Sequence, residues 1–214
     1  WYRPDLQAVV VVGDVDVNVI ESQIKRQFGG LSLPPNAPQR RYYPVADNKR
    51  MITHVMRDAE QPIALAHLYM KRDVKPTSVR SSERYQQEIY EHDLICLMLN
   101  ERLSKQQSGA KAPFTAASVK DGKFLIVQTK KAFSLSVSCK RDQIEAGLSA
   151  AVGLLEQARQ WGFTTGELTR AKGILRTKAE RCNNQRGQLA NHHYVKQCLD
   201  HYLYGEPILS TAEE

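Results

Sequence analysis

Glu88, Glu91 and His92 form the stretch whose residue types and spacing come nearest to a catalytic motif. A histidine in place of Glu88 would complete His-x-x-Glu-His, in which two histidines one helical turn apart bind zinc and the glutamate is the general base. The sequence as it stands lacks that histidine, and catalytic zinc needs three protein ligands. His92 also lies on the apolar stripe of a predicted helix. We therefore interpret His92 as a core-facing histidine and expect no metal site there.

A second group of possible metal ligands lies near the carboxyl end of the chain, and its spacing matches no established zinc pattern. It comprises His192, His193, Cys198 and His201, with Cys182 on the preceding predicted helix. Ordinary helix surface or core is the better interpretation. The sequence also contains no Gly-x-Gly-x-x-Gly, Walker loop or Gly-x-Ser-x-Gly, so neither a phosphate-binding loop nor a serine nucleophile is indicated.

The formal net charge is +7, with 30 Lys and Arg against 23 Asp and Glu. This excess raises a nucleic-acid hypothesis, but the basic residues are scattered in pairs without a recognition motif, so we interpret them as a solvated surface. The longest apolar run near the middle of the chain, Leu94–Leu99, is far too short to span a membrane. None of the four cysteines belongs to a Cys-x-x-Cys motif, and their number leaves the compartment open.

The elements that would position these residues begin with a predicted strand at Val9–Val12 and a helix that Asp16 caps and that ends near Phe28. Four prolines within twelve residues then favour an extended strap, and we interpret residues 31–48 as an interdomain linker. Two strands are predicted at Met51–Met56 and Ile63–Met70. The second is apolar on both faces, which is typical of a strand in the middle of a covered sheet.

A long helix is predicted across 85–103, where apolar residues recur at helical spacing. Three strands follow at Pro113–Val119, Phe124–Thr129 and Ala132–Cys139, with Asp121-Gly122 as the expected hairpin turn between the first two. The rest of the chain is predicted to be helical: 144–158, a helix capped by Thr164 or Thr165, 189–204, and the cap of a further helix at 210–214. The predicted fold class is α+β, with a largely antiparallel sheet packed by helices.

Two motifs give the sequence a family resemblance. Tyr2-Arg3-Pro4-Asp5, the strand Val9–Val12 with Gly13-Asp14, and Phe28-Gly29 resemble the Y-R-P-D-N…V-V-V-G-D…F-G segment of the insulinase (pitrilysin-like, inverzincin) zinc metallopeptidases. Residues 162–172, GFTTGELTRAK, are similar to that family's G-hydrophobic-T-x-x-E-L-x-R-A-K segment. The order of the linker, the long helix and the strands also agrees, so the resemblance covers nearly all of the chain.

The resemblance implies an incomplete, processing-peptidase-like fragment of duplicated α+β domains that enclose a substrate chamber. Residues 1–30 would be the terminal strand and helix of a preceding catalytic domain, 31–48 the linker, and 49–214 a second, non-catalytic domain. The zinc would be held in the preceding domain, and none is expected in this fragment. Glu88, Glu91 and His92 would be relics of the duplicated zinc helix, and Glu167 lies close to the family's spacing for a third ligand.

The same resemblance implies a substrate-binding pair, because active relatives often place an Arg and a Tyr seven residues apart after the long helix. This chain has Gln107 and Phe114 at those positions, and Phe114 has no hydroxyl with which to hold a substrate backbone. Arg102 and Lys111 are the possible substitutes. The candidate substrate-binding residues are therefore Arg102, Gln107, Lys111 and Phe114.

The expected function is that of a non-catalytic half of a zinc endopeptidase, which walls the substrate chamber and contacts peptide or unfolded protein beside the catalytic domain. The alternative is a catalytically inactive scaffold or interaction subunit of the same fold. Whether the parent hydrolyses anything, and whether the Glu88, Glu91, His92 and Glu167 set keeps any metal affinity, stay open. A periplasmic or cell-envelope location is the expectation from relatives.

Overall fold

The structure is a computed structural model that describes residues 2–108 and 111–208. The chain divides into two compact units. The sheet unit contains residues 43–76 and 82–178, and the terminal unit contains residues 2–42, 77–81 and 179–208. The expected domain boundaries at residues 30 and 48 stay a prediction. In the described part of the chain, no helix is both long and apolar enough to cross a bilayer.

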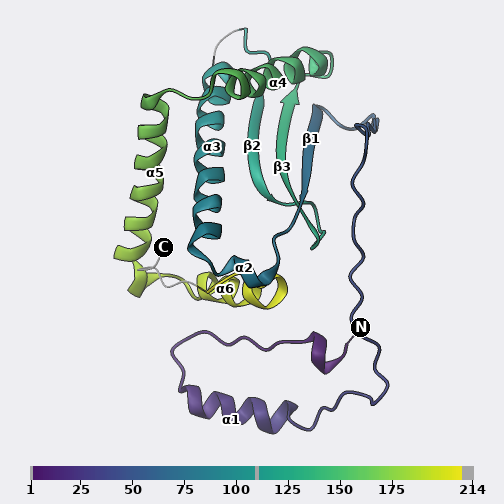
Figure 1. The fold of residues 1–214 in the computed structure, drawn as a ribbon, viewed down its shortest axis with the longest axis vertical. Coiled ribbons are helices and arrows are strands. Elements are labelled where there is room, and N and C mark those ends of the chain that lie inside the picture. The colour runs from purple at the N-terminus through teal and green to yellow at the C-terminus, as the bar shows by residue number, and fades with distance from the viewer. Residues whose placement is uncertain (1, 109–110, 209–214) are drawn as a thin grey trace. The chain divides into compact units, whose positions relative to one another are not determined.

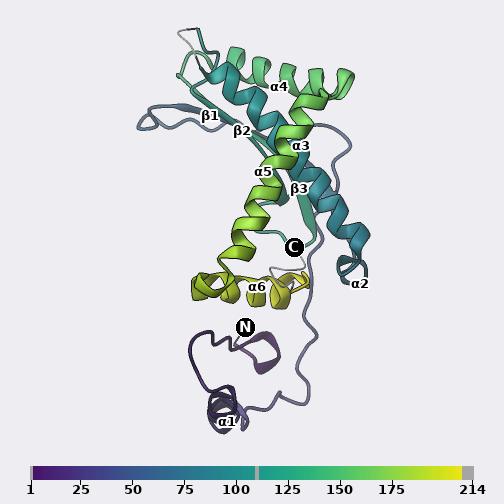
Figure 2. The ribbon, with the colours of Figure 1, turned by 90° about the vertical axis from the view of Figure 1, so that its left-hand side faces the viewer.

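Three antiparallel strands make the sheet, in the order β1-β3-β2. They are β1 (Ala64–Asp73), β2 (Ala116–Lys123) and β3 (Lys130–Cys139). Ala64 pairs with Cys139 and Asp73 with Lys130 across the first ladder. Helix α3 (Glu83–Gln107) lies along β2, and α4 (Ile144–Trp161) crosses the ends of the strands (Figure 1). In the view of Figure 2, α3 lies in front of the strands. The predicted α+β class and antiparallel sheet are confirmed.

The hydrophobic core lies between the sheet and these two helices. Alternate residues of β3, Leu135, Val137 and Cys139, are at most 1% exposed, because successive side chains of a strand point to opposite faces. The remaining members of the buried cluster come from α3, from β2 with the residues before it, and from α4: Leu99, Leu103, Phe114, Val119, Ala151 and Leu154. The apolar stripe predicted for the long helix therefore faces the core at Leu99 and Leu103, but His92 on the same stripe is not the core-facing histidine expected, because 42% of its side chain is exposed.

Helix α5 (Thr165–Asn184) begins in the sheet unit with Thr164 as its cap. The terminal unit contains α1 (Val17–Phe28), α2 (Thr77–Arg80) and α6 (Asn191–Tyr204), with short 3₁₀ turns at Pro4–Leu6 and Arg186–Gln188. The Asp16 carboxylate accepts from the amides of Asn18 and Val19, at 2.9 and 3.1 Å, and so caps α1 as predicted. The helices expected at 144–158, after Thr164 and at 189–204 are likewise confirmed. The cap expected at 210–214 lies outside the described residues.

Several strand predictions are wrong. Val9–Val12 and Met51–Met56 form no strand, because no neighbouring strand in the described chain hydrogen-bonds to them. β1 lies at an edge of the sheet instead of the middle, and Leu65 and Met70 are each 50% exposed. β3 is the central strand.

The predicted hairpin is also misplaced by several residues. Asp121 and Gly122 lie inside β2, where they pair with Phe133 and Ala132. The turn is formed by residues 124–129, with Leu125 at a φ of 51°. The Asp121 carboxylate bonds to Arg72 on β1 and His92 on α3, which holds this residue within the sheet. The expected three-strand meander is therefore a two-strand hairpin.

Candidate functional site

A cavity of about 540 Å³ lies where α3 ends, the residues before β2 begin and α4 starts. It brings together three of the four residues that the sequence nominated for substrate contact, Gln107, Lys111 and Phe114. The complete lining is Gln107, Lys111, Ala112, Pro113, Phe114, Thr115, Lys140, Gln143 and Ala146. Two lysines and no acidic residue belong to this lining, so the cavity favours an anionic or hydrogen-bond-accepting ligand.

The lining residues differ in what they offer a ligand. Phe114 is only 3% exposed and belongs to the hydrophobic core, so it forms part of the rigid wall. Gln107, Lys111 and Lys140 are exposed and present polar groups that a ligand can reach. Lys140 was not nominated from the sequence. It joins the cavity because β3 ends at Cys139, one residue earlier, and no motif in the sequence indicates that position.

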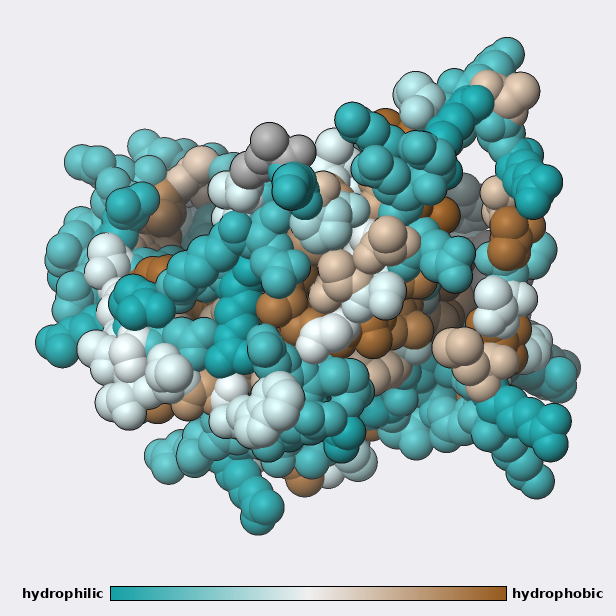
Figure 3. All heavy atoms as spheres, turned by 90° about the horizontal axis from the view of Figure 1, so that it is seen from above, coloured by the Kyte–Doolittle hydropathy of each residue, from teal (hydrophilic) through white to brown (hydrophobic). Residues whose placement is uncertain are grey.

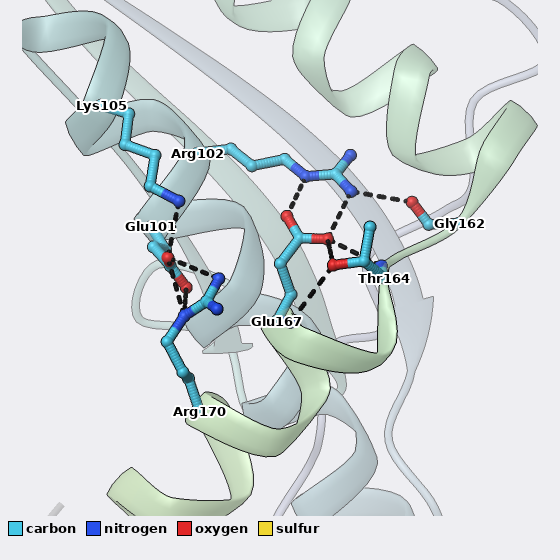
Figure 4. A network of polar contacts seen from close by, with 7 residues as sticks. All are labelled: Glu101, Arg102, Lys105, Gly162, Thr164, Glu167 and Arg170. Atoms are coloured by element: carbon cyan, nitrogen blue, oxygen red, sulfur yellow. Dashed lines mark hydrogen bonds and ion pairs between the residues drawn. The ribbon is translucent and has the colours of Figure 1, made fainter.

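Arg102, the fourth nominated residue, does not line this cavity. Its Nε lies 2.6 Å from Oε1 of Glu167, and its Nη2 lies 2.9 Å from Oε2 (Figure 4). Nη2 also donates to the carbonyl oxygen of Gly162 at 2.9 Å, and the guanidinium lies over the ring of Phe163 at 4.8 Å. Arg102 thus joins α3 to the beginning of α5.

Glu167 has a second set of partners within its own helix. Its Oε2 accepts from the amide and the hydroxyl of Thr164, at 2.8 and 3.0 Å, and its own amide donates to the Thr164 hydroxyl at 3.3 Å (Figure 4). This reciprocal arrangement is a capping box. The hydrogen bond from Arg102 is the main reason that the pKa of Glu167 falls to about 2. The carboxylate is therefore ionised and fully occupied by protein donors.

One turn after Glu167 on α5, a second and more exposed cluster also connects α5 to α3. Arg170 Nη2 lies 2.9 Å from Oε1 of Glu101, and Lys105 donates to the same oxygen at 2.7 Å (Figure 4). The Arg170 side chain is 52% exposed, against 17% for that of Arg102. Solvent screening makes the outer cluster much the weaker of the two.

His92 belongs to a separate network in the first half of α3. His92 Nδ1 lies 2.7 Å from Oδ2 of Asp121, and both Asp121 oxygens accept from Arg72, at 2.6 and 2.5 Å. Burial tends to raise the pKa of Asp121, but the hydrogen bonds and charges of Arg72 and His92 outweigh it, so the net shift is downward. Cys96 lies one turn further along α3, and burial raises the pKa of its thiol to about 11. That thiol is not an activated nucleophile.

The possible relics of a zinc site are not assembled. Glu167 bonds to Arg102, which lies ten residues after His92 on the same helix. The helix rises about 15 Å over those ten residues, so His92 and the partner of Glu167 are far apart along it. Glu88 pairs with Lys75 at 3.2 Å, and Glu91 accepts from Gln87 at 3.0 Å. Among the residues that the structure describes, no three His, Cys, Asp or Glu side chains converge as metal ligands would, and this includes the cluster around His201.

Asn100 is a structural residue that the sequence analysis did not single out. Its side-chain amide donates to the carbonyl oxygen of Val119 at 3.0 Å, and its side-chain oxygen accepts from the Val119 amide at 2.8 Å. The side chain of a helix thereby takes the place of a neighbouring strand at the outer edge of β2. Only the sheet register reveals this role, because an asparagine within a helical pattern gives no such signal.

This fold and these sites define an α+β domain that lacks an assembled catalytic centre in its described part. A family model described as the Peptidase M16 inactive domain matches residues 1–175, so the chain belongs to that family. The resemblance to the insulinase-type zinc metallopeptidases is thereby confirmed, as is the expectation of a non-catalytic domain.

Individual relatives agree with this family. The probable zinc protease PqqL of Escherichia coli K12 is 23% identical over 215 residues, which is all of this chain but 22% of that protein. The crystal structure of the first half of the periplasmic protease PqqL from E. coli matches 94% of this chain and 42% of its own, at 21% identity and a TM-score of 0.79. A predicted insulinase family protease from Yersinia pestis matches the same share of each chain at 13% identity and a TM-score of 0.75. These structures share the fold with this chain.

Proposed function

We propose that this chain is the non-catalytic region of a longer zinc endopeptidase, where it walls part of the substrate chamber and contacts peptide. The observation that carries the proposal is the cavity at the end of α3, which unites Gln107, Lys111 and Phe114. Gln107 and Phe114 stand at the positions of the family's substrate-binding pair, and Lys111 is a possible substitute for its arginine. Residues 1–30 would close a preceding catalytic domain, and residues 31–48 would link it to this one.

The chemistry of hydrolysis would be supplied by that other domain. The family's zinc activates a water molecule for attack on a peptide carbonyl, with a glutamate as base. The side chains that might have bound a second zinc ion here already have protein partners. Glu167 accepts from Arg102 and Thr164, and His92 pairs with Asp121. This chain would contribute to substrate recognition. Its relatives suggest a periplasmic or cell-envelope location.

The polar groups around the cavity indicate what part of a substrate they would hold. Lys111 and Lys140 are exposed ammonium groups that favour carboxylates, either acidic side chains or the carboxyl terminus of a peptide. Gln107 has both a donor and acceptors for a peptide backbone. Phe114 is buried and provides the firm wall against which such groups are positioned.

The test is made in the full-length protease with a fluorogenic peptide that carries an acidic residue. Lys111→Ala and Lys140→Ala are each expected to raise KM about ten- to hundredfold with little change in kcat, because one charge-assisted contact contributes about 1.5–3 kcal/mol. Lys172→Ala is the matched control, since it removes an exposed lysine from α5 away from the cavity. Equal KM values for all three variants would refute peptide contact at this cavity.

A different result would distinguish the proposed function from the alternative, an inactive scaffold subunit of the same fold. The longer protein would then contain no His-x-x-Glu-His motif, and neither it nor a partner subunit would hydrolyse peptides. Detection of zinc-dependent hydrolysis by the full-length protein would rule this alternative out.

A further inference from the structure

Residues 51–56 run extended and present two apolar side chains on each side, with Thr53 and His54 between them, and all six residues are exposed in the described chain (Figure 1). Met51 and Val55 point one way along the segment and Ile52 and Met56 the other, because successive side chains alternate. All four are 73–84% exposed. A strand with apolar residues on both faces is normally found inside a covered sheet. The sequence pattern is therefore that of a covered strand, but these side chains are exposed in the described chain.

Ion pairs and hydrogen bonds tether this segment at both ends. At one end, Lys71 donates to the carbonyl oxygen of Ala46 at 3.0 Å, and the buried Lys130 ammonium lies 2.7 Å from Asp47. At the other end, Arg141 donates to the carbonyl oxygens of Ala59 and Gln61, the first at 2.7 Å.

The sheet register shows where these tethers lie. Lys130 pairs with Asp73, at the end of β1, whereas Arg141 follows Cys139, which pairs with Ala64 at its start. The segment must therefore travel from one end of β1 to the other in the opposite direction. It does so without entering the sheet, although the connection 57–63 is short enough for a hairpin. Side chains hold it there, and the place of a ladder partner beside β1 stays open.

The two edges of the sheet differ in a way that supports this conclusion. At β2 the outward amide and carbonyl of Val119 are both bonded to Asn100, and α3 lies along the strand. β1 has no described strand on its outer side, and Leu65 and Met70, whose side chains lie on opposite faces of the sheet, are half exposed. Figure 3 shows a hollow, bordered by hydrophobic (brown) and hydrophilic (teal) residues, on the side where β1 and the segment 51–56 lie in Figure 1. The open, apolar edge is the β1 edge.

We infer that a strand from the remainder of the longer protein adds to the free edge of β1 and covers the apolar side chains of residues 51–56. The PqqL relative has more than four times the length of this chain, so ample polypeptide exists to supply it. The inference shares with the proposed function the premise of a longer protein, and it does not depend on peptide contact at the cavity.

Two other occupants fit the observations less well. A transient substrate would leave four large apolar side chains exposed on both faces whenever the site was empty, which favours aggregation. A second copy of this chain, in an antiparallel pairing centred on β1, would set the charged Lys71 and Arg72 opposite the apolar Ala66 and Leu65, which gives neither kind of side chain a suitable partner. A strand in the same polypeptide avoids both difficulties.

Methionine oxidation tests the inference without any substitution. Met51 and Met56 are 78% and 84% exposed here, whereas Met98 is 4% exposed and serves as the internal control. Dilute hydrogen peroxide is applied to this chain and, without peptide, to the full-length protein, and sulfoxide is measured by mass spectrometry. Met51 and Met56 are expected to oxidise at least tenfold more slowly in the full-length protein, while Met98 is slow in both.

Hydrogen exchange of β1 gives the second measurement. Alternate amides of Ala64–Asp73 point away from β3, and they should exchange quickly in this chain and slowly in the full-length protein. Equal exchange in the two proteins would overturn the inference. It would also be overturned if protection in this chain rose with concentration, which would indicate a second copy, or if protection of the full-length protein required added peptide. A failed KM test at the cavity would leave these results unaffected.

Discussion

Arg102 and Glu167 stand 65 residues apart in the sequence and meet in a two-pronged ion pair, with 2.6 Å between Nε and Oε1 and 2.9 Å between Nη2 and Oε2. The sequence suggested a substrate contact for the first residue and a vestigial zinc ligand for the second. The structure shows that each satisfies the other. Together they form the junction that joins the beginning of α5 to α3.

Breaking this junction from one side should be costly. Arg102→Ala leaves the Glu167 carboxylate largely buried with only Thr164 as partner, and we expect a loss of about 3 kcal/mol in the free energy of unfolding, measured with urea. Arg170→Ala is the matched control, because its pair with Glu101 is half exposed and its loss should cause a change of less than about 1 kcal/mol. Equal effects of the two substitutions would contradict the structural role of Arg102.

The same pair predicts how stability depends on pH. The pKa of Glu167 is about 2 in the folded chain, below its ordinary value of 4.5, so the folded state binds fewer protons than the unfolded state between these values. The stabilisation is complete above the unfolded pKa and is lost as the pH falls toward the folded pKa. Urea unfolding between pH 5 and 3 should therefore show a shallower loss of stability in Glu167→Gln than in the unsubstituted chain. Some slope will remain, because the pKa of Asp121 is also lowered. Identical slopes would refute the assignment.

The helices were predicted well because their capping and periodicity signals are local in the sequence. The strand predictions succeeded only where a distant segment of the chain supplies a pairing strand. Thr164 and Glu167 form their capping box within four residues, so the sequence alone contains the whole motif. Met51–Met56 has an equally clear strand pattern, but a strand needs a partner, and none lies in the described chain. The hairpin turn was misplaced because the carboxylate of Asp121 is engaged by Arg72 and His92 from two distant elements.

The candidate site was predictable only in part, for a similar reason. Gln107, Lys111 and Phe114 were found through the family resemblance, since no rule of spacing links them to a ligand. Lys140 was missed because it enters the cavity through the meeting of β3 and α4 with the end of α3. Arg102 was proposed as a substitute for the family's substrate-binding arginine, and only the fold revealed Glu167 beside it.

Asn100 should be essential to the edge of β2. Asn100→Leu conserves approximate size but leaves both the amide and the carbonyl of Val119 without their partner, and each unsatisfied buried group costs about 1–3 kcal/mol. We expect a loss of about 3 kcal/mol in the free energy of unfolding, with faster exchange of the Val119 amide. Asn100→Asp keeps the acceptor for that amide and should cost less. The role is refuted if the leucine variant is as stable as the unsubstituted chain.

Two glycines of α4 should respond to alanine in opposite directions. A Cβ at Gly147 would overlap the sulfur of Cys139 and lie 2.8 Å from the backbone oxygen of Pro113, which cannot move without disturbing the cavity wall. We expect Gly147→Ala to lower the free energy of unfolding by about 2 kcal/mol, as overpacked cores do. A Cβ at Gly153, in the same helix, would meet no atom within 4 Å, so Gly153→Ala should raise stability by about 0.5–1 kcal/mol through helix propensity alone. Urea unfolding of both variants decides the matter, and a stabilising Gly147→Ala would show that α4 does not press against the strand end and the cavity wall as closely as the structure indicates.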